Sequence, residues 1–130
     1  MLLKILAGVF LALHGLVHLL YLAQSRKVFE LAPGLTWPDG SWALSKLLGN
    51  PGVQTLAAFS LGLTALGFIT GGAGILLEQP WARLAAAAAA VLSTVLFLTF
   101  WNGEWKRLDN QGLIGIAINL AILAAVIWLR

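Results

Sequence analysis

The segment LLKILAGVFLALHGLVHLLYLA (residues 2–23) decides the fold class of this chain. An α-helix rises about 1.5 Å per residue, so about 20 apolar residues cross the roughly 30 Å of hydrocarbon in a bilayer. The segment reaches that length with one charged side chain, Lys4, near its beginning. The sequence therefore predicts a membrane-spanning helix at residues 2–23.

Three more apolar stretches follow, at residues 53–77, 81–101 and 112–129. Hydrophobic residues make up 60% of the 130-residue chain and charged residues only 10%, whereas about 25% of residues are charged in an ordinary soluble domain. A soluble fold of this size has too large a surface for its volume to hide so much apolar area. We predict one all-α domain, residues 1–130, folded as an integral membrane bundle of four transmembrane helices. We expect a multi-pass protein of a bacterial cytoplasmic membrane.

The positive charge of the chain indicates contact with lipid headgroups. The net charge is +3, but the lysines and arginines lie between the apolar stretches or near their ends, and they form no basic stripe. We therefore expect the lipid bilayer, and no nucleic acid, as a partner. The sequence has no cysteine, which excludes disulfides, thiol redox chemistry and cysteine-ligated metals within it.

The first stretch does not match a cleaved signal peptide well. Ala23 is a suitable small residue before a cleavage point, but Tyr21 occupies the other position that requires a small side chain. We expect residues 2–23 to be kept as the first helix.

Residues 24–52 form the longest predicted loop and are unusually apolar, with Trp37 and Trp42 among them. The sequence Trp37-Pro38-Asp39-Gly40 is typical of a turn, and Ser41 is a suitable N-cap for a short helix that ends near Leu48. We expect an interfacial segment between helices 1 and 2, or a cap over one end of the bundle.

Two histidines four residues apart, His14 and His18, are the main candidates for chemistry. This spacing puts both rings on one helix face. One interpretation is a pocket for a quinone, a lipid headgroup or another ligand, with His14, His18, Tyr21, Trp101 and Asn119 as the cofactor-binding residues. A metal site is a second interpretation, with Glu104 or Asp109 reaching His18. A haem would need a second chain, because histidines one turn apart cannot hold opposite faces of one iron.

The alternative is that the histidines only pack the bundle. A neutral imidazole between helices can form hydrogen bonds with polar side chains on its neighbours. The candidate partners are Ser60, Thr64, Ser93, Thr94, Thr99 and Asn119. The sequence leaves the cofactor and any metal undetermined.

Small residues predict close contacts between helices. Ser60, Thr64, Gly67 and Gly71 form a ridge on the second predicted helix, and residues 85–90 are all alanine. Small side chains allow helix backbones to approach one another in a membrane. No nucleophile elbow or phosphate-binding loop is present, so we expect no catalytic site.

Two short segments carry a resemblance to a known family. His14-Gly15-Leu16-Val17-His18-Leu19 and Gln111-Gly112-Leu113-Ile114-Gly115-Ile116 resemble small four-helix bacterial membrane proteins of the DoxX-like kind. The resemblance implies an accessory role in membrane redox or sulfur metabolism. Because the sequence has no cysteine, direct thiol chemistry is not part of that expectation.

Three functional hypotheses follow. The first is an accessory or self-associating subunit of a membrane complex, either as a homo-oligomer or with another membrane protein. The second is a membrane redox or ligand-binding protein that uses the histidine-lined pocket. The third is an oligomeric transporter of protons or small solutes.

Overall fold

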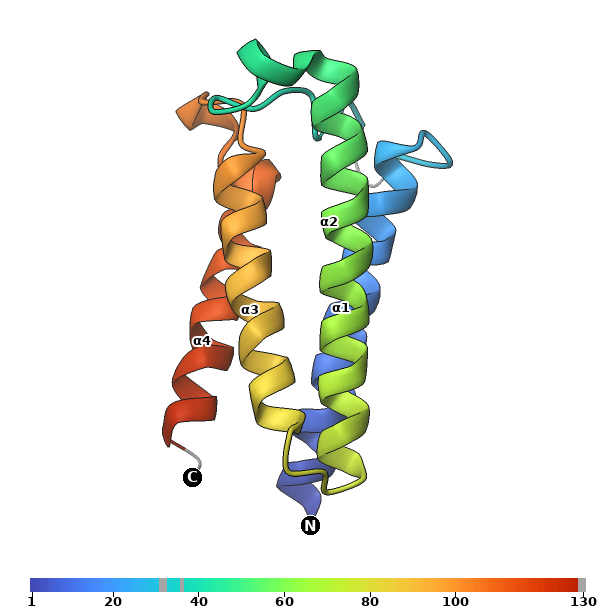
Figure 1. Cartoon of the computed structure of the whole chain (residues 1–130), viewed down its shortest axis with the longest axis vertical. Coiled ribbons are helices and arrows are strands. Elements are labelled where there is room, and N and C mark those ends of the chain that lie inside the picture. Colours follow the sequence, from blue (N-terminus) through green and yellow to red (C-terminus); the bar gives the residue numbers. More distant parts are fainter. Residues whose placement is uncertain (31–32, 36, 129–130) are drawn as a thin grey trace.

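The computed structural model describes residues 1–30, 33–35 and 37–128, and every regular element within them is helical. The four long helices in Figure 1 are α1 (Leu2–Ser25), α2 (Ser45–Leu76), α3 (Ala82–Thr99) and α4 (Ile114–Trp128). Two short helical turns, Trp105–Arg107 and Asp109–Leu113, join α3 to α4. The prediction of a four-helix, all-α chain is confirmed. The end of the predicted fourth span, Leu129, lies outside the described residues.

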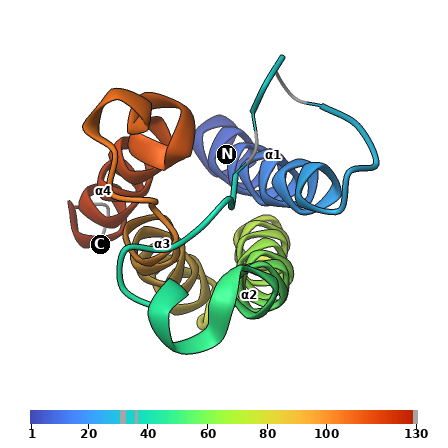
Figure 2. The same ribbon diagram turned by 90° about the horizontal axis from the view of Figure 1, so that it is seen from above.

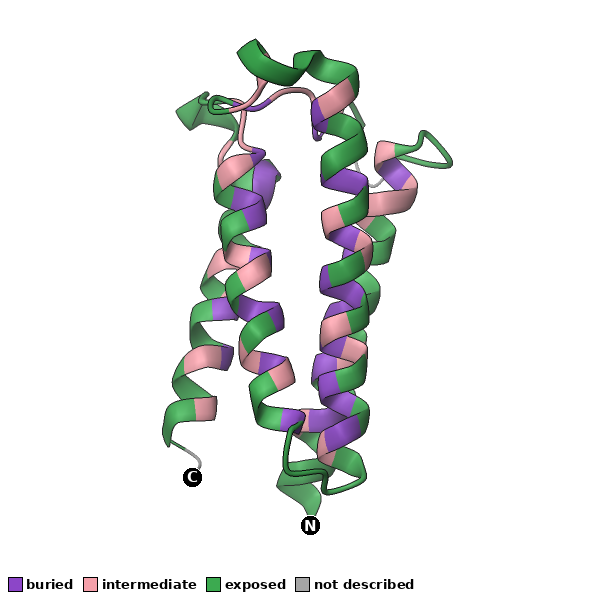
Figure 3. Cartoon of the chain, viewed as in Figure 1, coloured by how far each residue is buried: buried purple, intermediate pink, exposed green. Residues whose placement is uncertain are grey.

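Four helical segments are long and apolar enough to cross a membrane: Leu2–Ser25, Ser45–Leu76, Ala82–Thr99 and Asp109–Trp128. Figure 3 shows that buried residues line the inward sides of the helices and that exposed residues cover their outward faces. Many of the exposed residues are large and apolar, including Leu13, Phe59, Leu84 and Ile127. Soluble monomers rarely expose contiguous apolar surface on this scale, so the burial pattern is compatible with a membrane protein.

Neighbouring helices in the sequence pack against each other: α1 on α2, α2 on α3, and α3 on α4. Both chain ends lie at one end of the molecule, and the view from above shows the four helices standing around a common axis (Figures 1 and 2). In the part of the chain that the structure describes, α1 and α4 share no comparable packing. One side of the bundle is therefore not closed by helix packing.

The first two helices approach closely because glycine faces glycine where they cross. A Cβ atom added to Gly72 would lie 2.5 Å from the carbonyl oxygen of Gly8, and one added to Gly15 would lie 2.9 Å from that of Ala65. Real Cβ atoms do not approach other atoms this closely. Glycine at these positions therefore sets the distance between α1 and α2.

The small-residue ridge of α2 meets the alanine run of α3. A Cβ atom on Gly71 would lie 2.9 Å from the backbone nitrogen of Ala86, and one on Gly67 would lie 3.0 Å from the Cβ of Ala89. Both alanines are buried. The ridge predicted from the sequence is thus used for packing inside this chain.

The segment between α1 and α2 caps the end of the bundle opposite the chain ends (Figure 1). Trp37 is its anchor: its side chain is 1% exposed and packs in a cluster with Val53, Leu61 and Phe97. Gln24, at the end of α1, donates hydrogen bonds to the carbonyls of Leu35 (3.2 Å) and Trp37 (3.0 Å).

The same segment supplies hydrogen bonds to the end of α3. The last carbonyls of a helix have no partner within it and must be satisfied from elsewhere. Four successive carbonyls accept from the cap: Leu98 from the Trp42 indole (2.8 Å), Thr99 from the Ser41 hydroxyl, Phe100 from the Trp37 indole (3.1 Å), and Trp101 from the backbone N–H of Trp42 (2.9 Å). The cap therefore terminates a helix that lies far away in the sequence.

The boundaries of two helices differ from the prediction. The second helix begins at Ser45, because the predicted short helix ending near Leu48 joins the main helix across Gly49, whose φ of 66° and ψ of 169° break the helical backbone. The fourth helix begins at Ile114, because Gly112 has a φ of 114°. The ring of Phe97 fills the space that a side chain at Gly112 would occupy.

We expect Gly72→Val to lower the free energy of unfolding by about 1–3 kcal/mol, the usual cost of overpacking. The added methyl groups would meet the backbone of α1. The measurement is thermal unfolding in detergent, followed by circular dichroism. Ala73→Val, on the same helix, is the matched control, since Ala73 is exposed. Equal effects of the two substitutions would contradict the close crossing.

We expect Trp37→Phe to lower the free energy of unfolding by about 1–3 kcal/mol, because the buried carbonyl of Phe100 would lose its donor. The same unfolding measurement applies. Trp105→Phe is the control, because the Trp105 side chain is exposed. A Trp37→Phe protein as stable as the control would show that the indole N–H does not hold the cap.

Candidate functional site

His14 and His18 face the interior of the bundle, as their spacing predicts. Their side chains are 7% and 1% exposed, and their rings meet edge to face with centroids 5.0 Å apart. Phe68 of α2 lies against both rings, at 4.7 Å from His14 and 5.4 Å from His18. The two histidines thus stand among aromatic side chains in the middle of α1.

A continuous chain of hydrogen bonds connects the histidines to α3 and α4. Nε2 of His14 lies 3.1 Å from Oδ1 of Asn119. Nδ2 of Asn119 lies 2.8 Å from Oγ of Ser93, and this oxygen lies 2.7 Å from Nε2 of His18. The last hydrogen bond of the series joins Nδ1 of His18 to the backbone carbonyl of His14, at 2.9 Å.

When both histidines are neutral, the backbone carbonyl of His14 fixes which group donates in every hydrogen bond of the series. A carbonyl only accepts, so His18 carries its proton on Nδ1 and accepts at Nε2 from the hydroxyl of Ser93. Ser93 then accepts from the amide nitrogen of Asn119, whose oxygen accepts from Nε2–H of His14. Each of these polar atoms has a partner without any ligand being added.

This arrangement is poorly suited to a metal. A metal ligand must present a free lone pair, but the Nε2 lone pair of His18 is engaged with Ser93. Across residues 1–30, 33–35 and 37–128, no three side chains of histidine, cysteine, aspartate or glutamate gather as a metal site. Glu104, one of the two carboxylates proposed from the sequence, is exposed and paired with Arg107 at 3.0 Å. Asp109, the other, is exposed and accepts from the backbone of Asn110.

The five predicted pocket residues divide into three groups. His14, His18 and Asn119 are brought together directly, and Asn119 is fully buried. Tyr21 lies one turn nearer the cap and is joined to His18 through Phe97, whose ring contacts both Tyr21 (5.9 Å) and His18 (5.8 Å). Trp101 lies apart, just beyond the end of α3 and next to the cap, and its ring packs against Trp105 at 5.1 Å.

Ser93 was only one of six possible partners in the sequence, yet it is the central link of the network. It accepts from Asn119 and donates to His18. Three of the other predicted hydroxyl partners turn back on their own helices: Ser60 donates to the carbonyl of Leu56, Thr64 to that of Ser60 and Thr94 to that of Ala90. Position on the inner face of α3, which helix packing determines, distinguishes Ser93 from them.

Comparison of the chain with protein-family models, with curated proteins and with solved structures gives no match. The DoxX-like resemblance of residues 14–19 and 111–116 therefore stays a prediction.

We expect Asn119→Leu to lower the free energy of unfolding by about 1–2 kcal/mol, since hydrogen bonds between membrane helices average about 0.6 kcal/mol each and two are lost. Chemical unfolding in mixed detergent micelles measures the change. Thr94→Val is the control, because this hydroxyl bonds only within α3. In a double-mutant cycle, His14→Ala and Asn119→Leu should be non-additive, and strict additivity would argue against the network.

Proposed function

We propose that this chain is a small non-enzymatic subunit of a bacterial cytoplasmic membrane that acts by associating with a second copy of itself. The observation that carries the proposal is the closed network of His14, His18, Ser93 and Asn119. These groups satisfy one another, so they hold the helices together and leave the outer faces of the bundle for function. The four helices would span the bilayer, with the cap at one interface.

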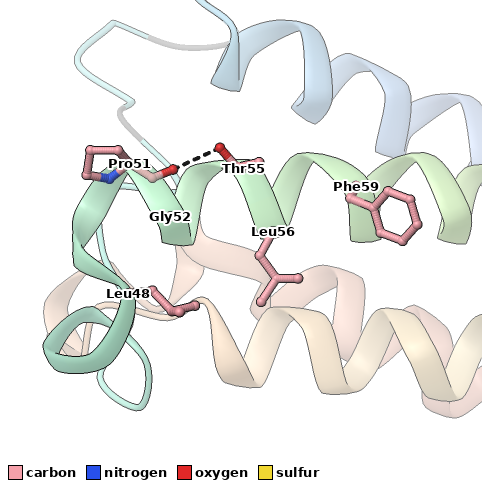
Figure 4. Close-up of a pocket in the computed structure, with 6 residues that line it drawn as sticks. All are labelled: Leu48, Pro51, Gly52, Thr55, Leu56 and Phe59. Atoms are coloured by element: carbon pink, nitrogen blue, oxygen red, sulfur yellow. Dashed lines mark hydrogen bonds between the residues drawn. The ribbon is translucent and has the colours of Figure 1, made fainter.

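The outer face of α2 offers a surface for the second copy. Close to the cap, this face is hollowed into a shallow recess (Figure 4). The recess is lined by Leu48, Pro51, Gly52, Thr55, Leu56 and Phe59. The hydroxyl of Thr55 donates to the carbonyl of Pro51 on the same helix, at 3.0 Å. With its polar group satisfied locally, the recess presents an apolar surface.

Phe59 and Gly62 support a symmetric contact on this face. The side chain of Phe59 is 71% exposed, and a Cβ atom at Gly62, one turn further along, would meet nothing within 4 Å. Other helical glycines, such as Gly8, Gly71 and Gly72, are already covered within the chain. In a twofold dimer, Phe59 of each copy can pack over Gly62 of the other.

The resemblance to DoxX-like proteins favours the same class of role, since it implies a small accessory subunit. The redox and ligand-binding hypothesis requires His14 or His18 to exchange one of its hydrogen bonds for a bond to the ligand. The transporter hypothesis requires an oligomer with the histidines on a pathway. Both stay predictions.

Crosslinking through single cysteines tests self-association, because the sequence has no cysteine of its own. In membranes treated with an oxidant, we expect Phe59→Cys to form disulfide-linked dimers several-fold more than Val91→Cys, an exposed position on α3. In a Phe59→Cys background, Gly62→Leu should reduce the dimer yield about tenfold, since overpacking costs about 1–3 kcal/mol. Ala88→Leu, on the exposed side of α3, is the control.

Equal crosslinking at Phe59→Cys and Val91→Cys would mean that the pairs form by random collision. In that case the α2 face is not an interface, and the proposal fails.

A further inference from the structure

The open side of the bundle, between α1 and α4, contains a groove of about 890 Å³. Ligand pockets generally measure about 300–1,000 Å³, so the groove has the size of a binding site. It runs about 12 Å along α4 from Val126 to Ile118, at about 1.5 Å per residue. Its walls are mainly apolar and include Ala7, Leu11, Ala121, Ile122 and Ala125.

The inner end of the groove is apolar. Phe10 and Ile118 lie there, and the ring of Phe10 is nearly parallel to that of His14, with centroids 6.0 Å apart and an interplanar angle of 4°. Beyond Phe10, His14 and Asn119 bond to each other. A ligand in this groove would therefore meet hydrocarbon and an aromatic ring at its deep end.

The opposite end of the groove is a charged rim formed by Lys4, Glu78, Gln79 and Arg83. Lys4 donates to Glu78 at 2.9 Å, and this hydrogen bond and the charge of Lys4 hold the pKa of the Glu78 carboxyl below its usual value. Glu78 is therefore ionised at neutral pH and offsets one cation. Arg83 is exposed and forms no ion pair among the described residues, which leaves the rim with one net positive charge.

We propose that the groove binds an anionic diacyl phospholipid from the surrounding leaflet. One acyl chain lies along α4 in the groove, and the phosphate contacts Arg83 and Lys4 at the rim. The open side between α1 and α4 would face lipid, so a lipid enters sideways. The inference rests on the membrane placement proposed above, but it uses a different face of the protein from the α2 contact.

The test uses the full chain in nanodiscs made of equal parts phosphatidylglycerol and phosphatidylcholine. After gentle release, native mass spectrometry counts the lipids retained by each protein. A cation near a membrane surface is worth about fivefold in affinity for anionic lipid. We expect phosphatidylglycerol to be retained about fivefold over phosphatidylcholine, and Arg83→Gln to abolish that preference. Lys46→Gln is the charge control, because Lys46 is exposed at the cap end.

A second pair of variants tests the groove itself. Ala121→Phe should fill it and remove retained lipid of either kind, whereas Ala124→Phe should have no effect, because Ala124 is exposed on the same helix but does not line the groove. Thermal unfolding checks that both proteins fold. Unchanged crosslinking at Phe59→Cys in the Ala121→Phe protein would separate this proposal from self-association.

Several outcomes would overturn the proposal. These are no retained lipid, equal retention of the two lipids with no effect of Arg83→Gln, or unchanged retention in Ala121→Phe. Free glycerol phosphate that competes as well as the intact lipid would show a phosphate site without a role for the acyl chain. Disulfide-linked dimers of Ala121→Cys would show that a second copy fills the groove.

Discussion

The hydrogen bond between His14 and Asn119 holds together the side of the bundle that helix packing leaves open. The backbones of α1 and α2, of α2 and α3, and of α3 and α4 pack closely. Among the described residues, α1 and α4 share little such contact. Ser93 strengthens this link, because it joins Asn119 of α4 to His18 of α1. The link between the first and last helices therefore depends on a polar network, whereas close packing of small residues and Phe97 joins each helix to its neighbour in the sequence.

The network also bears on the role of His14 and His18. A buried polar group is costly unless it is paired, and a network is stable when all of its members are satisfied. In their neutral forms, both ring nitrogens of His18 and Nε2 of His14 are paired with the chain's own atoms. This favours a structural role for the pair and leaves two surfaces for function, the outer face of α2 and the groove between α1 and α4.

Much of this architecture could be predicted from the sequence, because it depends on local patterns. Apolar length identifies the four helices, and the spacing of His14 and His18 puts them on one face. The choice of Ser93 over Thr94 depends on which face of α3 turns inward, a property of the packed bundle. One feature depends on a contact distant in sequence: Trp101 lies next to the cap and not with the histidines, and its carbonyl accepts from the backbone N–H of Trp42. The groove arises from the spacing of α1 and α4, which no local pattern encodes.

The capped end of α3 has a consequence for how the protein is made. Unpaired carbonyls in hydrocarbon cost several kcal/mol each, so a helix that ends near lipid needs its partners at once. Here the donors are Trp37, Ser41 and Trp42, and the acceptors follow more than fifty residues later. Synthesis proceeds from the N-terminus, so the ribosome delivers the donors first. The donors of the cap are thus already part of the chain when the carbonyls that accept from them are made.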